Sequence, residues 1–376
     1  MTSDASVTFR AGHAAGTAWQ PVIRRCLDDL GRLPADANLG FVYVTDALAN
    51  DMQRILDLLR QETGIADWVG TVGLGICAAG REYFDEPAAS VMVAALPPDG
   101  FRLLPQRRGE DDEIAADLAQ WIVKHKPALG LVHADPRNTE LVELLGDTAD
   151  RTGAYLIGGL TSSRGQMPQV ATTVAQRGLS GVLFAADLPM AAGLSQGCSP
   201  IGPARTVTRS ERNVIHTLDG DLALDALKED LGVSDAGGLK RSIATIHVAL
   251  PVPGSDGGDY LVRNLMGADP EAGAIAIGAA VDPGARVIFC RRDPDSAERD
   301  LRQMLRDVRS RLEGPPKGGI YVSCLARGPN MFGAGSRELG IVSEELGDFP
   351  LAGFFANGEI SRNRLYGYTG VLALFV

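Results

Sequence analysis

Apolar residues along the chain form short continuous runs separated by amphipathic segments, and this order recurs three times. The three stretches span residues 39–97, 129–188 and 318–376. Each begins with a continuous apolar run, such as Phe41–Val44, which is typical of a strand buried on both faces. An amphipathic helix, a second apolar run, a glycine-rich turn and a closing apolar run follow in each. The helical positions of the first stretch are Met52, Ile55, Leu56 and Leu59.

The same internal order in three stretches indicates duplication. It predicts an α/β protein of two related halves, built from repeated strand–helix–strand–glycine turn–strand units, with mixed sheets flanked by helices. The remaining patterns predict helices at Asp111–Lys126 and Ala297–Leu312 and strands at Tyr260–Val262, Ala274–Ala279 and Arg286–Cys290.

A glycine- and proline-rich segment lies between the second and third stretches. Residues 193–203 read GLSQGCSPIGP, which no helix can accommodate. Two short strands follow, and then DLALDALKEDLG begins a helix with Asp219 or Asp221 as its N-cap. We therefore place a divide near residue 219, which gives an N-terminal domain of residues 1–219 and a C-terminal domain of residues 220–376.

Composition and charge narrow the class of partner. The 376 residues include 36 basic and 47 acidic side chains, a net charge of −11, with no cluster of Lys or Arg. This balance argues against nucleic acid or an anionic membrane as the main partner. The first ten residues contain Asp4 and no apolar stretch, and the longest apolar runs are too short to cross a membrane. We expect a cytoplasmic protein.

The motifs of common catalytic and metal sites are absent or incomplete. Five cysteines, an odd number without a C-x-x-C pair, predict neither a disulfide framework nor a zinc site. Gly193–Gly197 matches G-x-S-x-G but lacks the helix that a nucleophile elbow needs. Gly75–Gly80 and Gly353–Gly358 have the spacing of a phosphate loop without its Lys-Ser/Thr. The five histidines show no metal-binding spacing, although a single axial haem ligand would leave none, so haem stays open.

The glycine turns at the ends of apolar strands are the best candidate for a site. In the third stretch Arg327 follows one strand and Glu359 follows the next. Because the carboxyl ends of neighbouring parallel strands meet at one edge of a sheet, both side chains are expected at a crevice that could bind a small molecule. The alternative is that Arg327 and Glu359 only pair with each other.

At these residues the chain resembles the FIST sensory domain family, over about residues 36–376. The motifs that carry the resemblance are Gly75-Ile-Cys-Ala-Ala-Gly80, residues 193–203, Val207-Thr208, Leu218-Asp219-Gly220, Cys324-x-x-Arg327-Gly328 and Gly353-Phe-Phe-Ala-Asn-Gly358-Glu359-Ile360. The chain departs from the family pattern at Cys77, Ala78 and Arg81, where Ser, Thr and Glu are more usual. The resemblance implies a sensor of amino acids or similar polar metabolites that acts through a signalling partner such as a kinase.

The resemblance also implies where the ligand binds. The expected contacts are Cys324, Arg327, Asn330, Phe355, Asn357, Gly358 and Glu359 in the C-terminal half, and Gly75, Cys77, Gly80 and Arg81 in the N-terminal half. We therefore expect a small-ligand sensor that has no cofactor and is not an enzyme. Three alternatives stay open: a haem-binding nitric-oxide sensor, an enzyme with Cys324 or Cys77 as nucleophile, and an adaptor that pairs a peptide with a sheet edge.

Overall fold

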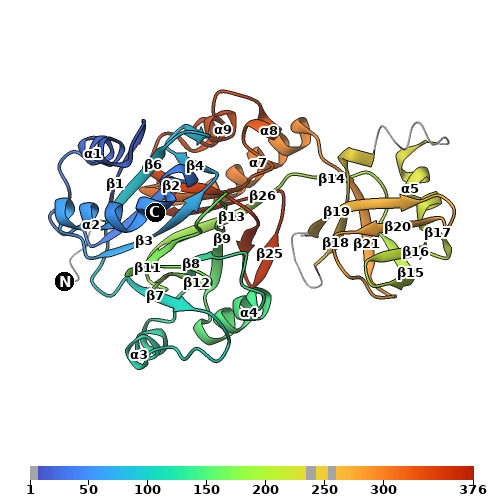
Figure 1. Cartoon of the computed structure of the whole chain (residues 1–376), viewed down its shortest axis with the longest axis horizontal. Helices are drawn as coiled ribbons and strands as arrows, with labels where there is room; N and C mark the ends of the chain where they lie inside the picture. Colours follow the sequence, from blue (N-terminus) through green and yellow to red (C-terminus); the bar gives the residue numbers. More distant parts are fainter. Residues whose placement is uncertain (1–6, 234–242, 253–259) are drawn as a thin grey trace. The chain divides into compact units, whose positions relative to one another are not determined.

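A computed structural model describes residues 7–233, 243–252 and 260–376 (Figure 1). The chain forms two compact units: unit 1 contains Met1–Ser195 with Leu301–Val376, and unit 2 contains Gln196–Asp300. Unit 2 is thus an insertion in unit 1. The divide predicted near residue 219 falls within unit 2, and the assignment of separate domains to 1–219 and 220–376 stays a prediction.

Unit 1 contains three copies of one strand–helix–strand–helix–strand–hairpin–strand pattern. The first copy consists of β1 (Thr8–Ala15), α1 (Trp19–Leu30), β2 (Leu39–Thr45), η1 (Asp46–Asp51), α2 (Met52–Thr63), β3 (Asp67–Gly73), β4 (Gly75–Ala78), β5 (Arg81–Phe84) and β6 (Ala88–Ala95). The second consists of β7 (Phe101–Arg107), α3 (Ala116–His125), β8 (Leu129–Ala134), α4 (Leu141–Thr152), β9 (Tyr155–Leu160), β10 (Gln169–Ala171), β11 (Thr173–Ala175) and β12 (Leu179–Phe184).

The third copy is interrupted by unit 2 after its first strand. It consists of β13 (Met190–Gln196), α7 (Pro294–Arg309), β22 (Gly318–Cys324), α8 (Pro329–Phe332), α9 (Arg337–Leu346), β23 (Leu351–Ala356), β24 (Glu359–Ser361), β25 (Arg364–Tyr366) and β26 (Thr369–Phe375). The repeat that the apolar pattern predicts is therefore longer than the three stretches, because each copy also includes a strand and a helix before them.

Strand directions confirm the predicted repeats. β2 is parallel to β3 and antiparallel to β6, β8 has the same relations to β9 and β12, and β22 to β23 and β26. A glycine lies at the same place in β3, β9 and β23, where a Cβ would be 1.7–1.8 Å from a carbonyl oxygen of the neighbouring strand. These glycines are Gly70, Gly158 and Gly353. The close backbone approach explains why each copy needs a residue without a side chain there.

Each copy gives its hairpin to the sheet of another copy. β4 of the first copy pairs with β23, β10 of the second with β3, and β24 of the third with β9. The result is three six-stranded sheets, each completed by a hairpin from elsewhere in the chain. Gly75 and Gly353, which the sequence motifs align, therefore lie in different structural positions.

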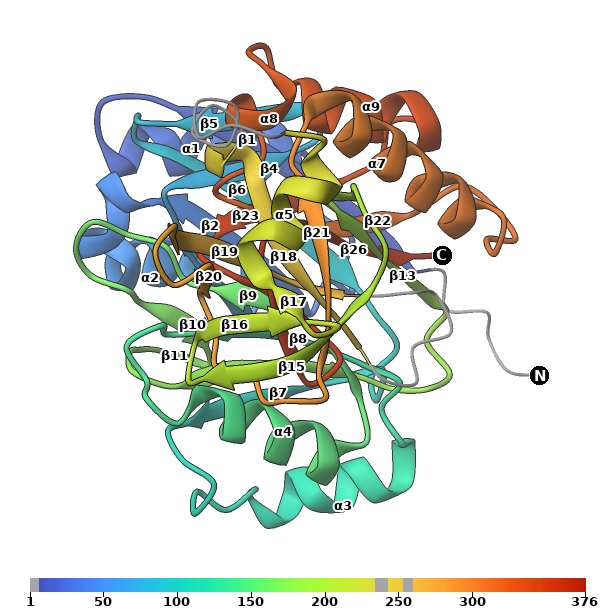
Figure 2. The same cartoon turned by 90° about the vertical axis from the view of Figure 1, so that its right-hand side faces the viewer.

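The three sheets share one apolar core, and the helices lie outside them. Residues from all three copies, among them Phe41, Leu131 and Ile320, form one buried cluster. Figures 1 and 2 show α1 with α2, α3 with α4, and α7 with α9 on three different sides of unit 1. The strands are apolar on both faces because one face meets this core and the other a helix layer.

Unit 2 is a closed antiparallel barrel. Its strands pair in the ring β18–β19–β20–β16–β15–β21, and β21 closes the ring by pairing with β18. These strands are β15 (Arg205–Glu211), β16 (Val214–Leu218), β18 (Ile246–Pro251), β19 (Tyr260–Asp269), β20 (Ala274–Ile277) and β21 (Arg286–Arg291). The short strands β14 (Ser199–Pro200) and β17 (Asp221–Leu222), the helix α5 (Ala223–Leu231) and the 3-10 turn η2 (Ile243–Thr245) accompany it.

Two local predictions need correction. The helix expected from Asp111 begins at Ala116, because the acidic segment before it interacts with Arg107 and Arg108 instead. The N-cap of α5 is Leu222 rather than Asp219 or Asp221, since Asp219 occupies a turn with φ of 51° and Asp221 pairs with β16. Among the described residues, no helix is long and apolar enough to cross a membrane.

Candidate ligand site

Arg327 lies just beyond the carboxyl end of β22, where its guanidinium group is fully buried against Glu338 of α9. Nε of Arg327 is 2.7 Å from Oε1 of Glu338, and a second guanidinium nitrogen is 3.4 Å from Oγ of Ser195. Phe332 lies beneath the guanidinium, with its ring centre 5.0 Å away. The strand-end crevice predicted on this side is therefore filled by a side chain of the protein itself.

Glu338 is saturated with hydrogen bonds. Besides Arg327, Oε1 accepts one from the Tyr321 hydroxyl at 2.7 Å and one from Ser323 at 2.9 Å. Oε2 accepts from the backbone N–H of Gly328 at 2.8 Å and from Ser323 at 3.0 Å. A buried charged pair with this many partners is a structural element whose disruption is costly.

The hairpin β4–β5 of the first copy completes this cluster. The backbone N–H of Glu82 donates to Oγ of Ser336 at 2.9 Å, and Oε1 of Glu82 accepts from the N–H of Leu339 at 3.2 Å. Burial and then the nearby charge of Glu338 raise the pKa of Glu82 to about 7. Hairpin and α9 are thus joined by a carboxyl group that titrates near neutral pH.

Glu359 begins β24 and belongs to a different environment. Its side chain is fully buried, and Oε2 accepts hydrogen bonds from the backbone N–H and the hydroxyl of Thr369, at 3.0 and 2.7 Å. Within the described chain, Oε1 has no well-formed hydrogen bond. Burial raises the pKa of Glu359 to about 7, although bonds from Thr369 and the weak thiol donor of Cys324 oppose the rise.

The predicted pair of Arg327 and Glu359 is therefore not a direct ion pair. The carboxylate partner of Arg327 is Glu338, at 2.7 Å, and Glu359 feels the guanidinium only as a nearby charge. Both side chains are near the carboxyl end of β22, as predicted, but different groups satisfy them. Their assignment as ligand contacts stays a prediction.

The fold brings several predicted contacts of the two halves into one sheet, although Glu359 on β24 belongs to another sheet. Cys77 of β4 lies opposite Gly353 of β23, and the Phe355 side chain packs in the same cluster as Cys77. Cys324 and Gly358 are buried, whereas Asn330, Asn357 and Arg81 are exposed. The remaining two are glycines: Gly75 is buried in β4, and Gly80 occupies the hairpin turn with φ of 64°.

The local charges disfavour either predicted thiol as a nucleophile. Burial and the carboxylates of Glu82 and Glu338 raise the pKa of Cys77. Burial and Glu359 raise the pKa of Cys324 to about 12. A nucleophilic cysteine needs the opposite environment, one that stabilises the thiolate.

His133, near the end of β8, is a core residue. Its side chain is fully buried, Nε2 is 3.1 Å from the Tyr43 hydroxyl, and burial lowers its pKa to about 3. The described part of the chain contains no group of three or more His, Cys, Asp or Glu side chains that could hold a metal ion.

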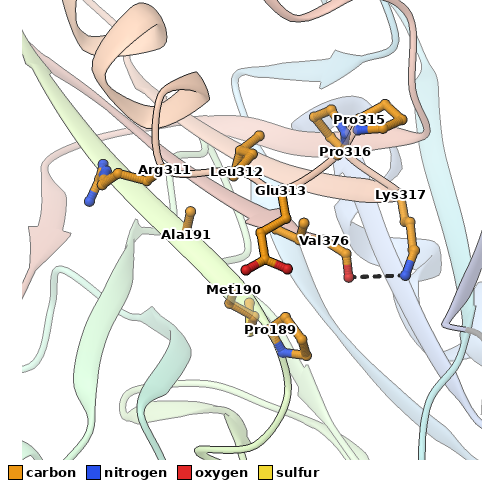
Figure 3. A pocket seen from close by; sticks show the side chains of 11 residues that line it. Pro189, Met190, Ala191, Arg311, Leu312, Glu313, Pro315, Pro316, Lys317 and Val376 are labelled. Atoms are coloured by element: carbon orange, nitrogen blue, oxygen red, sulfur yellow. Dashed lines mark hydrogen bonds between the residues drawn. The ribbon is translucent and has the colours of Figure 1, made fainter. Parts of the chain in front are cut away.

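A surface pocket of about 660 Å³ lies at the opposite end of β22 (Figure 3). Apolar side chains such as Met190 and Leu312 line it together with Arg311, Glu313 and Lys317. Figure 3 shows the Glu313 carboxylate directed toward Met190, and Nζ of Lys317 donates to the Val376 carbonyl oxygen at 3.1 Å. None of the predicted contact residues lines this pocket.

Two family models together match most of the chain. A FIST N domain matches residues 38–221, and a FIST C domain matches residues 223–362. The chain belongs to the FIST family. These two matches confirm the resemblance seen in the motifs. FIST domains as a family are sensory, non-catalytic domains of signal transduction.

Relatives of the FIST protein include uncharacterized mycobacterial proteins. One from Mycobacterium tuberculosis strain H37Rv is 36% identical over 331 residues, which cover 82% of this chain and 83% of the relative. Another from Mycobacterium bovis is 32% identical over 354 residues, with 90% and 89% covered. The similarity thus extends across both FIST regions.

Several residues of the site escape sequence reasoning, above all Glu338. Its position carries a usable signal: Ile341 and Val342, three and four residues later, are buried, so Glu338 lies on the apolar stripe of α9. A charged residue on such a stripe needs a buried partner. Ser195, part of the discounted G-x-S-x-G motif, is a neighbour of the Arg327 guanidinium, and the short strand β14, not a helix, is the next element after β13.

Proposed function

We propose that this FIST protein is a cytoplasmic sensor of an amino acid or similar polar metabolite and acts through a separate output protein such as a kinase. The observation that carries the proposal is the Glu359 carboxyl group, fully buried with one oxygen lacking a well-formed hydrogen bond. A buried polar atom without a partner raises the free energy of the folded state, and a ligand that supplies a donor recovers it.

The chemistry of this position favours a ligand with an ammonium group. Oε1 of Glu359 accepts hydrogen bonds only while the carboxyl group is ionised or its proton lies on the other oxygen, and an ammonium group provides both donor and countercharge. The positive charge of Arg327 lies near enough to lower the pKa of Glu359, so it can also attract the carboxylate of an amino acid. Asn357, two positions before Glu359, is exposed.

A calorimetric comparison of two variants tests the proposal. A panel of amino acids and small amines is first screened by thermal shift on the wild type, and each compound that raises the melting temperature is titrated. Glu359→Gln keeps the shape but removes the charge, and it should weaken binding about 10–150-fold, equivalent to roughly 1.5–3 kcal/mol. Glu344→Gln, an exposed carboxylate of α9, is the matched control and should bind normally. Equal affinities in wild type and Glu359→Gln would contradict the assignment.

A further inference from the structure

Unit 2 brings together two thiols that lie far apart in the sequence. Cys198 comes immediately before β14, and the next residues of that strand, Ser199 and Pro200, pair with Arg291 and Cys290 of β21. Cys198 lies two residues before Pro200, the pairing partner of Cys290, so both cysteine side chains lie on the same face of the sheet. Their interaction contributes to a raised pKa of Cys290. Both side chains are buried, Cys198 at 5% and Cys290 at 0% exposure, and both cysteines are reduced.

The surroundings hold this pair in place. His247 of β18 lies directly opposite Cys290, and the hydroxyl of Tyr260 donates to the carbonyl oxygen of Cys198. Burial lowers the pKa of His247, so its imidazole is neutral at neutral pH. Two uncharged side chains, those of His247 and Tyr260, thus adjoin the pair.

The cysteines of unit 1 have different neighbours. The thiol of Cys26 faces the carbonyl oxygen of Ala89 at 3.5 Å, that of Cys77 the carboxylates of Glu82 and Glu338, and that of Cys324 the carboxyl group of Glu359. Within the described part of the chain, Cys198 and Cys290 are the only two cysteines whose thiols interact with each other.

We propose that Cys198 and Cys290 are a redox-sensitive pair that a peroxide converts into an intramolecular disulfide. The thiol of Cys198 releases its proton, its sulfur attacks one peroxide oxygen, and the O–O bond breaks to give a sulfenic acid. The hydroxide that leaves takes up the released proton as the first water. The sulfur of Cys290 then attacks the sulfur of Cys198, the S–O bond breaks, and the released hydroxide takes the proton of Cys290 as a second water. Two thiols and one hydrogen peroxide thus give one disulfide and two waters.

The different environments of the two thiols set the order of these steps. The interaction with Cys198 and burial raise the pKa of Cys290, which therefore keeps its proton, and Cys290 is also fully buried. Cys198, the more exposed of the two, is therefore the residue that meets the oxidant, and Cys290 resolves the sulfenic acid. A dithiol reductant of the thioredoxin class would reverse the reaction by thiol–disulfide exchange.

The position of the pair suits a switch because the chain enters and leaves unit 2 beside it. The entering segment passes from β13 through Gln196 to Cys198, and the leaving segment runs from β21 into α7. Gln196 already contacts the leaving segment, since its backbone N–H donates to Oδ2 of Asp300 at 2.5 Å. A disulfide between Cys198 and Cys290 would join these two segments of unit 2 covalently.

Thiol counting and mass spectrometry on the full chain test the proposal. The reduced protein is treated with hydrogen peroxide, alkylated, unfolded, and analysed for free thiols and cross-linked peptides. Of the five thiols, two should be lost together. Their peptides should contain Cys198 and Cys290, joined with the loss of two hydrogens, and dithiothreitol should restore both.

Single variants establish the order and provide the control. In Cys290→Ser, Cys198 should accumulate as a sulfenic acid that dimedone traps, whereas in Cys198→Ser the Cys290 thiol should persist. Cys26→Ser is the matched control and should still form the cross-link, because Cys26 contacts a carbonyl oxygen instead. Five intact thiols after peroxide treatment, or a disulfide that involves Cys26, Cys77 or Cys324, would overturn the proposal without any reference to the variants' stability.

Discussion

Replacing Glu359 by glutamine is expected to remove a large pH dependence of stability. The pKa of this carboxyl group is about 7 in the folded protein against an ordinary value of 4.5. Below pH 4.5 both folded and unfolded chains hold the proton. As the pH rises from 4.5 to 7, the unfolded chain releases it while the folded chain keeps it, so the free energy of unfolding falls. Above pH 7 the loss is complete.

The size of the effect follows from the difference of about 2.5 pKa units, which at about 1.36 kcal/mol each gives a loss of about 3 kcal/mol. A carboxamide suits this position, because Gln169 holds the equivalent place in the first sheet. Gln169 of β10 lies opposite Thr71 of β3, just as Glu359 of β24 lies opposite Gly159 of β9. The carboxamide oxygen of the Glu359→Gln variant would also accept the hydrogen bonds of Thr369 at every pH.

Urea unfolding of wild type and Glu359→Gln between pH 4.5 and 8 measures the effect. The stability of the variant relative to wild type should rise with pH by up to about 3 kcal/mol. Glu82, whose pKa is also about 7, titrates in both proteins and cancels in the difference. Parallel pH profiles for the two proteins would refute the reasoning, because Glu359 would then titrate as an ordinary carboxylate.

Three further predictions concern the cluster, the repeats and haem. Glu338→Ala should destabilise the protein by about 3–5 kcal/mol by leaving Arg327 buried without its carboxylate, whereas Glu344→Ala on the exposed face should change the melting curve little; similar curves for both would be inconsistent with the cluster. Gly158→Ala should abolish folding as judged by circular dichroism, since its Cβ would lie 1.8 Å from the Val132 carbonyl oxygen. Gly146→Ala in α4, with open space around it, should raise the free energy of unfolding in urea by about 0.5–1 kcal/mol. A well-folded Gly158→Ala would disprove the close approach. The absorption spectrum of the purified protein should lack a Soret band, because His133 is buried, neutral and bonded to Tyr43; a band that disappears on replacing one histidine would reverse this.

The repeats could be predicted from the sequence, but their exchange of hairpins could not. A strand buried on both faces has a distinctive apolar run, so β2, β8 and β22 are visible without a structure. A hairpin has the same local pattern whichever sheet it joins. That β4 pairs with β23, and not with a strand of its own copy, depends on contacts between residues nearly 300 positions apart, as Cys77 and Gly353 show.

The candidate site, like the fold, could be predicted only in part from the sequence. The glycine turns correctly indicate that Arg327 and Glu359 lie near strand ends, but they do not predict that both side chains are fully buried. The glycine turns do not predict the hydrogen-bond partners of these side chains. Glu338, the partner of Arg327, belongs to a helix that begins ten residues further on, and in the sequence it is one of several acidic residues of α9. The cysteines are a second example: spacing predicts no disulfide framework, yet the pairing of β14 with β21 brings Cys198 beside Cys290.

The exchanged hairpins give the two polar clusters different mechanical roles. Glu338 has a donor for each oxygen and, with Glu82, joins the first copy's hairpin to α9 of the third copy. Glu359 lies on β24, which pairs with β9 of the second copy, while its bonds come from Thr369 on β26 of the third. A ligand can shift a conformational equilibrium only if it binds one conformation more tightly than the other. A buried polar atom without a hydrogen bond offers such a difference, because a ligand that bonds to it stabilises one conformation. Of the two clusters, only the one around Glu359 has a carboxylate oxygen that, within the described chain, still lacks a well-formed bond. A ligand bound there would therefore change the contact between the second and third sheets, whereas the Arg327–Glu338 cluster would keep the first and third sheets fixed.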